Sequence, residues 1–145
     1  MSGPALRKVE SHHAIHDTAW READEAFRMA VKAHGSDNGE RFARVAEVFL
    51  QVMEGRILVH AAEEEQGLYH EWLTVDTTLQ PTIDELIHEH GTIRQGSSEL
   101  ERAMIRGEYD EAVSVMHQLL DMSARHSRHE ENVLRLLSVK RSETR

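Results

Sequence analysis

A motif that occurs twice constrains the fold of this chain of 145 residues more than any other feature. It reads His-x3-Glu-Glu-x2-Leu, and its copies begin at His60 and at His126. A His and a Glu four residues apart share one face of an α-helix, so His60 with Glu64, and His126 with Glu130, can each reach one point. Imidazole and carboxylate on one helical face suit Fe, Mn or Zn. Solvated helices often carry one such pair, but two copies of the longer motif favour a metal site.

The composition predicts an all-α protein. The chain has two prolines and 5% aromatic residues, while Ala, Glu, Leu, Arg and Met are frequent, which favours helix over sheet. Its length corresponds to about one domain with a single core. The chain contains no cysteine, which excludes disulfides, thiolate zinc sites, cysteine-ligated iron–sulfur clusters and thiol nucleophiles.

The charge and hydropathy exclude two classes of partner. The formal net charge is −9, with acidic residues spread along the chain, so nucleic acid lacks the basic patch that it requires. No apolar stretch has the length of a signal peptide or of a membrane span, so no membrane partner is expected. We therefore expect a soluble cytoplasmic protein, either a monomer or a homodimer.

Helix-breaking residues divide the chain into four long segments. Turn-forming sequences occur at 35–39, at 74–81 and around Gly107. The apolar spacing between them predicts four helices, and 138–145 is expected to be a charged, frayed tail. The predicted helices span about 9–34, 40–72, 82–106 and 110–137. Short loops between such helices imply one domain over 1–145, an up-down-up-down antiparallel four-helix bundle.

All four predicted helices carry a candidate ligand at a similar height in the bundle. His12 and His60 lie roughly 33 and 30 Å from the first loop, and His90 and His126 each lie roughly 24 Å from the third loop. His12 and His90 each begin a His-x2-Ile sequence, which indicates a duplicated helix pair around a twofold axis. The side chains expected to converge on two metal ions are His12, His60, Glu64, His90, His126 and Glu130.

This order of residues, a His, a His-x3-Glu, a second His and a second His-x3-Glu, resembles the hemerythrin-like family, or HHE cation-binding domain. The resemblance covers nearly the whole chain, and the residues around both motifs, including Glu65, Tyr69 and Glu89, are similar to bacterial members such as the C-terminal domain of iron-centre repair proteins. It implies two non-haem iron ions, oxo- or hydroxo-bridged, that Glu64 and Glu130 bridge and His side chains complete. Open iron positions would then bind O₂, NO or H₂O₂, for sensing, binding or the handling of iron, oxidative or nitrosative stress.

The third helix departs from the family pattern. Oxygen-carrying hemerythrins place two His four residues apart there, but Leu86 and Arg94 flank His90 at that spacing. The departure argues against simple reversible oxygen carriage. A di-iron enzyme, either catalase-like or an oxidase, is therefore an alternative. An iron storage or donation protein is a further one.

The ligand on the first helix is open. His16 lies one turn after His12 on the same face and is the candidate for a fifth His. The helix is rich in alanine, however, and His13 and His16 lie on a rival apolar stripe. We favour His12, while His13 or His16 could join or replace it.

The remaining patterns give weaker expectations. His88 and His129 fall outside the apolar stripes and are expected in solvent, whereas Tyr69 or His70 could supply an outer hydrogen bond. Ferritin-like Glu-x2-His pairs begin at Glu10 and at Glu85 but lie on the first and third helices, where that architecture does not place them. A structural zinc or a bundle without metal is a further alternative. Apolar residues one turn from the candidates would shape the pocket, namely Ile57, Ile87, Ile93, Met122 and Val133.

Overall fold

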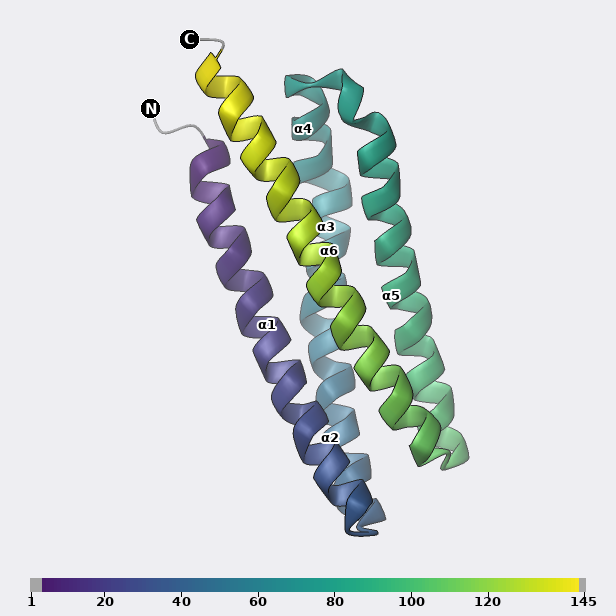
Figure 1. Cartoon of the computed structure of the whole chain (residues 1–145). Coiled ribbons are helices and arrows are strands. Elements are labelled where there is room, and N and C mark those ends of the chain that lie inside the picture. Colours follow the sequence, from purple (N-terminus) through teal and green to yellow (C-terminus); the bar gives the residue numbers. More distant parts are fainter. Residues whose placement is uncertain (1–3, 144–145) are drawn as a thin grey trace.

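The protein is a set of long helices packed along their sides. The computed structural model describes the backbone of residues 4–143 and the side chains of residues 14–140. Within these residues there is no β-strand, so the all-α prediction is confirmed. Four helical segments lie side by side (Figure 1), and the first contacts both the second and the fourth.

Two of the four segments are interrupted or preceded by other helical turns. The second segment is one continuous helix with two π-helical turns inside it, and a short 3₁₀ turn precedes the third. The elements, in chain order, are α1 (Pro4–Gly35), α2 (Gly39–Val52), η1 (Met53–Ile57), α3 (Leu58–Glu63), η2 (Glu64–Leu68), α4 (Tyr69–Val75), η3 (Thr77–Leu79), α5 (Gln80–Arg106) and α6 (Tyr109–Glu143).

Local signals mark the turns that connect the segments (Figure 1). The side chain of Asn38 accepts a hydrogen bond of 3.1 Å from the Arg41 backbone N–H and so caps α2. Pro81 lies in the first turn of α5, where its missing N–H costs nothing, and Gly107 ends that helix with a φ of 69°. The helix-breaking residues of the sequence therefore lie at the ends of the helices.

The C-terminal segment differs from its prediction. Residues predicted as a frayed tail continue α6 as far as Glu143, because they contain neither Pro nor Gly. The Ser138 hydroxyl donates a hydrogen bond of 3.0 Å to the Leu134 carbonyl within the helix, and Lys140 forms an ion pair with Asp76 beside η3. A contact outside α6 thus supports its last described turns.

Two apolar clusters form the core, and a polar layer separates them. The larger cluster includes Phe49 and Met53 on the second segment and Leu119 on α6, while the smaller includes Tyr69 and Leu86. The face that α1 contributes consists of small residues, which let this helix approach its neighbours closely. Its buried members are Ala19, Ala23, Ala26, Ala30 and Ala33.

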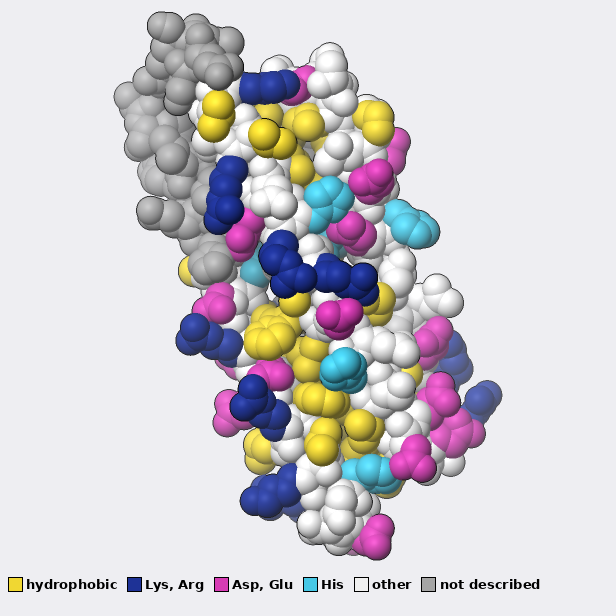
Figure 2. Space-filling model, viewed as in Figure 1, with side chains coloured by type: hydrophobic (Ala, Val, Ile, Leu, Met, Phe, Trp, Pro, Cys, Tyr) yellow, Lys and Arg dark blue, Asp and Glu magenta, His cyan; other side chains and the backbone are white. Residues whose placement is uncertain are grey.

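The surface is acidic but mixed. Figure 2 shows Lys and Arg side chains interspersed with Asp and Glu side chains on the visible face. No described helix is long and apolar enough to cross a lipid bilayer.

α6 packs closely against α5 at Gly96. A Cβ atom there would lie 2.6 Å from Leu119 Cδ2, and Leu119 is fully buried. We expect Gly96→Val to lower the free energy of unfolding by about 1–3 kcal/mol through overpacking. Gly91→Val, on the same helix with nothing within 4 Å, should change it by less than about 0.5 kcal/mol. Urea denaturation compares the two variants, and equal losses would contradict the close approach.

Candidate metal centre

The second π-helical turn sets the geometry of the second segment around Glu64. Residues five apart on a regular α-helix point in directions about 140° apart. In η2 the wider turn is closed by a hydrogen bond from the Tyr69 backbone N–H to the Glu64 carbonyl, which brings both side chains to the same side. Tyr69 is consequently buried, whereas Leu68, expected to continue the apolar stripe, is only half-buried.

Four ionisable side chains meet in the polar layer between the two apolar clusters. Glu64 from the second segment, His90 from α5, and His126 and Glu130 from α6 are each at most 5% exposed. His126 Nε2 lies 2.7 Å from Glu130 Oε1 and 2.8 Å from His90 Nε2, which in turn lies 3.3 Å from Glu64 Oε1. One donor atom from each residue falls within 4.8 Å of the others, so this cluster could hold a metal ion.

A second group of three side chains shares Glu64 with the first. His16 from α1 and His60 from α3 supply the other two, and the donor atoms again lie within 4.8 Å of one another. The two imidazole rings pack edge to face with centroids 5.1 Å apart. His60 Nε2 lies 3.7 Å from Glu64 Oε2, and His16 Nε2 lies 3.7 Å from Glu130 Oε1. Each carboxylate therefore faces His residues of both groups.

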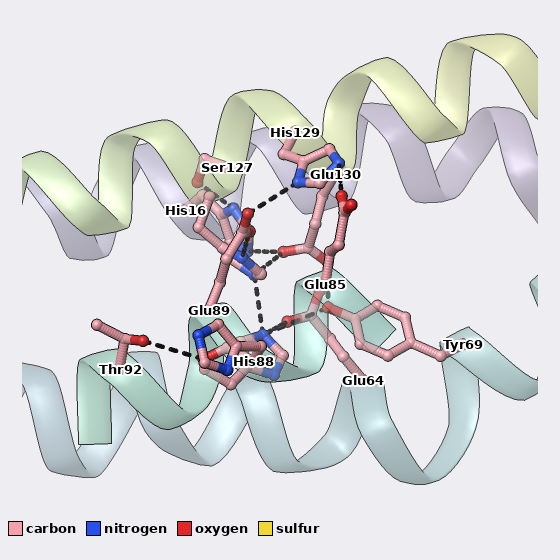
Figure 3. A network of polar contacts seen from close by, with 12 residues as sticks. His16, Glu64, Tyr69, Glu85, His88, Glu89, Thr92, Ser127, His129 and Glu130 are labelled. Carbon is pink, nitrogen blue, oxygen red and sulfur yellow. Dashed lines mark hydrogen bonds and ion pairs between the residues drawn. The ribbon is translucent and has the colours of Figure 1, made fainter. Parts of the chain in front are cut away.

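All four segments thus contribute side chains to one site. Figure 3 shows Glu64 and Glu130 within it. Six of the seven side chains singled out in the sequence lie together, and the side chain of the seventh, His12, lies outside the described residues. On α1 the structure places His16 beside the carboxylates. The exposed His88 faces away from the site, as expected from its position on the helix.

Glu65 orients the ring of His90. Its carboxylate lies 3.0 Å from His90 Nδ1 and also accepts a hydrogen bond of 2.6 Å from Arg94. With Nδ1 engaged there, Nε2 of His90 points at the cluster, an arrangement typical of metal-binding histidines. Arg94 lies where the sequence resemblance would place a second histidine, and its cation positions Glu65.

Glu89 orients the ring of His126 in the same way. Its two oxygens lie 2.6 Å from His126 Nδ1 and 2.9 Å from His129 Nδ1. His129, expected in solvent, is therefore half-buried and engaged. Sequence reasoning missed both outer carboxylates as functional groups, although Glu65 doubles the Glu of the first motif and Glu89 directly precedes His90.

We expect Glu89→Ala to weaken metal binding by about 10–100-fold, the usual cost of losing a carboxylate that orients a histidine ligand. Glu85→Ala is the matched control, because Glu85 lies one turn away on α5, is 70% exposed and approaches His129 only to 3.9 Å. Competition against a chelator measures the affinity of both variants. An effect of equal size in the control would refute the orienting role of Glu89.

The electrostatics of the cluster favour a bound cation. Burial, then a hydrogen bond and repulsion from Glu130, raise the pKa of Glu64 to about 12. Burial and the neighbouring His126 lower the pKa of His90 to about 4. Burial lowers the pKa of His126, but the bond to Glu130 outweighs it and raises the pKa overall. None of the described Lys or Arg side chains is buried, so neither acid is offset by a Lys or Arg within the cluster.

Tyr69 completes the buried layer. Its hydroxyl donates a hydrogen bond of 3.2 Å to Glu130 Oε2 and lies 3.3 Å from His90 Nε2 (Figure 3). Burial and the nearby carboxylates raise its pKa, so the phenol keeps its proton and acts as a donor. Of the two residues considered for an outer hydrogen bond, Tyr69 therefore lies in position, while His70 is exposed.

A cavity of about 40 Å³ opens beside the cluster. Ile57 and Ile93 line it as predicted. Ile87 was expected to line it too, but its side chain is 36% exposed, because the buried stripe of α5 passes through Leu86 and Ile93 instead. Met122 and Val133 pack into the apolar clusters, outside the described lining of this cavity.

Comparison with protein families, curated proteins and solved structures finds no match to this chain. The helical structure and its buried His/Glu cluster are compatible with the hemerythrin-like resemblance of the sequence.

Proposed function

We propose that the chain is a hemerythrin-like protein with a carboxylate-bridged, non-haem di-iron centre that binds O₂, NO or H₂O₂. It would act in sensing or binding, or in handling iron, oxidative or nitrosative stress. The proposal includes one domain with the up-down-up-down antiparallel arrangement of that family, which the reversals in Figure 1 support.

The observation that carries the proposal is the position of the two buried carboxylates between two sets of imidazoles. Glu64 belongs to both groups of donor atoms, and Glu130 lies 2.7 Å from His126 and 3.7 Å from His16. A carboxylate shared in this way would be able to bridge two ions. Mixed imidazole and carboxylate donors also suit iron.

The protein's own residues would hold the ions and control access to them. His16 and His60 would bind one ion, and His90 and His126 would bind the other. Contacts of the ring nitrogens that face away from the ions, or of neighbouring residues, would fix the orientation of the rings. When bound, the two irons would supply redox chemistry between ferrous and ferric states and open positions for a small ligand. Ile57 would help to exclude water from the cavity.

The size of the cavity supports a small ligand over an organic substrate. One water molecule needs about 10–15 Å³ on the scale in which this cavity measures about 40 Å³. Diatomic molecules and peroxide are closer to this size than a larger organic substrate is.

The proposal also includes a cytoplasmic setting, no membrane partner, and a monomer or homodimer. The net charge of −9 argues against a nucleic-acid partner.

Elemental analysis of protein produced with iron available tests the proposal. We expect about two irons per chain, with near-ultraviolet bands that bleach on anaerobic reduction and return in air. Zinc alone, or no metal, would refute it. Sustained consumption of peroxide by the iron-loaded protein would assign it to an enzyme instead of a binding module.

A further inference from the structure

One buried hydroxyl in the cavity wall has no assigned role. Ser123 lies on α6, three residues before His126, and is 7% exposed. Its Oγ makes no hydrogen bond with any other described residue, and the residue is one of those that line the cavity beside the cluster. A buried hydroxyl without a partner costs about 1–3 kcal/mol, so this group is placed where it destabilises the protein unless something binds to it.

The other polar groups around the cavity outside the cluster are already engaged. The Ser127 hydroxyl bonds to His16 Nδ1, and Arg56 pairs with Glu22. The Trp20 indole N–H donates a hydrogen bond of 3.0 Å to the Leu120 carbonyl. The rest of the wall is largely apolar. Among the described side chains outside the cluster, Ser123 therefore supplies the hydrogen-bonding capacity that is free to meet a ligand.

We propose that the Ser123 hydroxyl donates a hydrogen bond to the outer atom of a two- or three-atom ligand held in this cavity. The inference rests on the proposed function, since the inner end of the ligand is held at the metal centre. Ser123 selects among ligands that fit the space, because one whose outer atom carries negative charge gains a charge-assisted hydrogen bond. A neutral ligand with a weak acceptor gains less.

The chain offers a matched control in Ser97. This residue lies on α5, is 2% exposed, and its Oγ likewise has no hydrogen-bond partner among the described residues. It is absent from the described lining of the cavity. Alanine at either position removes one buried hydroxyl without a partner, but only Ser123→Ala removes a hydroxyl from a residue that lines the cavity.

Azide titration of the iron-loaded full chain tests the proposal, with azide as a three-atom anionic probe and its visible absorption as the readout. We expect Ser123→Ala to raise the azide Kd by about 10–100-fold, the loss of one hydrogen bond to a charged acceptor. Ser97→Ala should leave it within about twofold of the parent protein. Iron content should be equal in all three proteins.

The outcomes separate this inference from the function on which it rests. An unchanged Kd in Ser123→Ala, with normal iron content, would overturn the role of Ser123 and leave the di-iron proposal intact. Lower iron content in Ser123→Ala would also overturn it, because the hydroxyl would then help to build the centre. Failure of the parent protein to hold iron or to bind azide would overturn both.

Discussion

Replacing Glu64 or Glu130 by alanine is expected to abolish iron binding. Both side chains are almost fully buried, and each faces His residues of both donor groups, so either change would remove a donor from both of the proposed ions. Loss of a carboxylate that merely orients a ligand costs about 10–100-fold, and loss of a bridging donor should exceed about 100-fold. Iron per chain after anaerobic loading and desalting measures the effect.

Neighbouring residues of the same type provide the controls. Glu63 directly precedes Glu64 but is exposed, and His88 lies two residues from the buried His90 but is exposed. Glu63→Ala and His88→Ala should keep the iron content of the parent protein, whereas His90→Ala should lower it. Retention of iron by Glu64→Ala, or equal loss in Glu63→Ala, would show that the buried cluster is not the metal site.

Much of the fold follows from local signals that the sequence carries openly. The capping residue Asn38 and the positive φ of Gly107 mark helix ends that were predicted to within a few residues. The structure extends α6 beyond its predicted end to Glu143, and there the ion pair between Lys140 and Asp76 joins residues far apart in the chain. Such a contact has no periodic signature in the sequence.

The π-helical turns mark the limit of periodicity arguments. A stripe that follows the regular helical repeat passes from Glu64 to Leu68, whereas the inserted residue of η2 brings Tyr69 into the core instead. Each π-helical turn contains a glycine, Gly55 in η1 and Gly67 in η2, but a single glycine inside a helical pattern does not specify a π-turn. π-turns often occur at functional sites, and here the turn brings a phenol to within 3.2 Å of Glu130.

Residue spacing on the helices predicted which histidines and carboxylates lie together, because i and i+4 positions share a face. It could not choose among the histidines of α1, where small alanines make two faces look alike. The supporting groups Glu65, Glu89 and Ser123 could not be assigned either, because their roles depend on which ring or cavity of another helix they meet.

The metal-free protein is expected to lose stability as the pH rises from about 7 to about 9. The pKa of Glu64 is about 12 in the fold against 4.5 when unperturbed, so over this interval the unfolded chain has released a proton that the folded chain retains. His126, whose pKa is raised, acts in the same direction, since its stabilising proton is lost as the pH passes the folded value. His90, with a pKa lowered to about 4, is neutral in both states here and contributes nothing.

Glu64→Gln should flatten this dependence, because glutamine has no proton to release. One titrating group contributes on the order of 1 kcal/mol per pH unit, so the slope should fall by about that amount. Glu63→Gln should keep the parent slope, since Glu63 is exposed. Ferrous iron should reverse the trend in the parent protein, because binding requires ionised Glu64 and so strengthens as the pH rises. Anaerobic urea denaturation at several pH values measures the slopes of the three metal-free proteins and of the parent protein with iron. Identical metal-free slopes for the parent protein and Glu64→Gln would contradict a protonated carboxyl in the buried cluster.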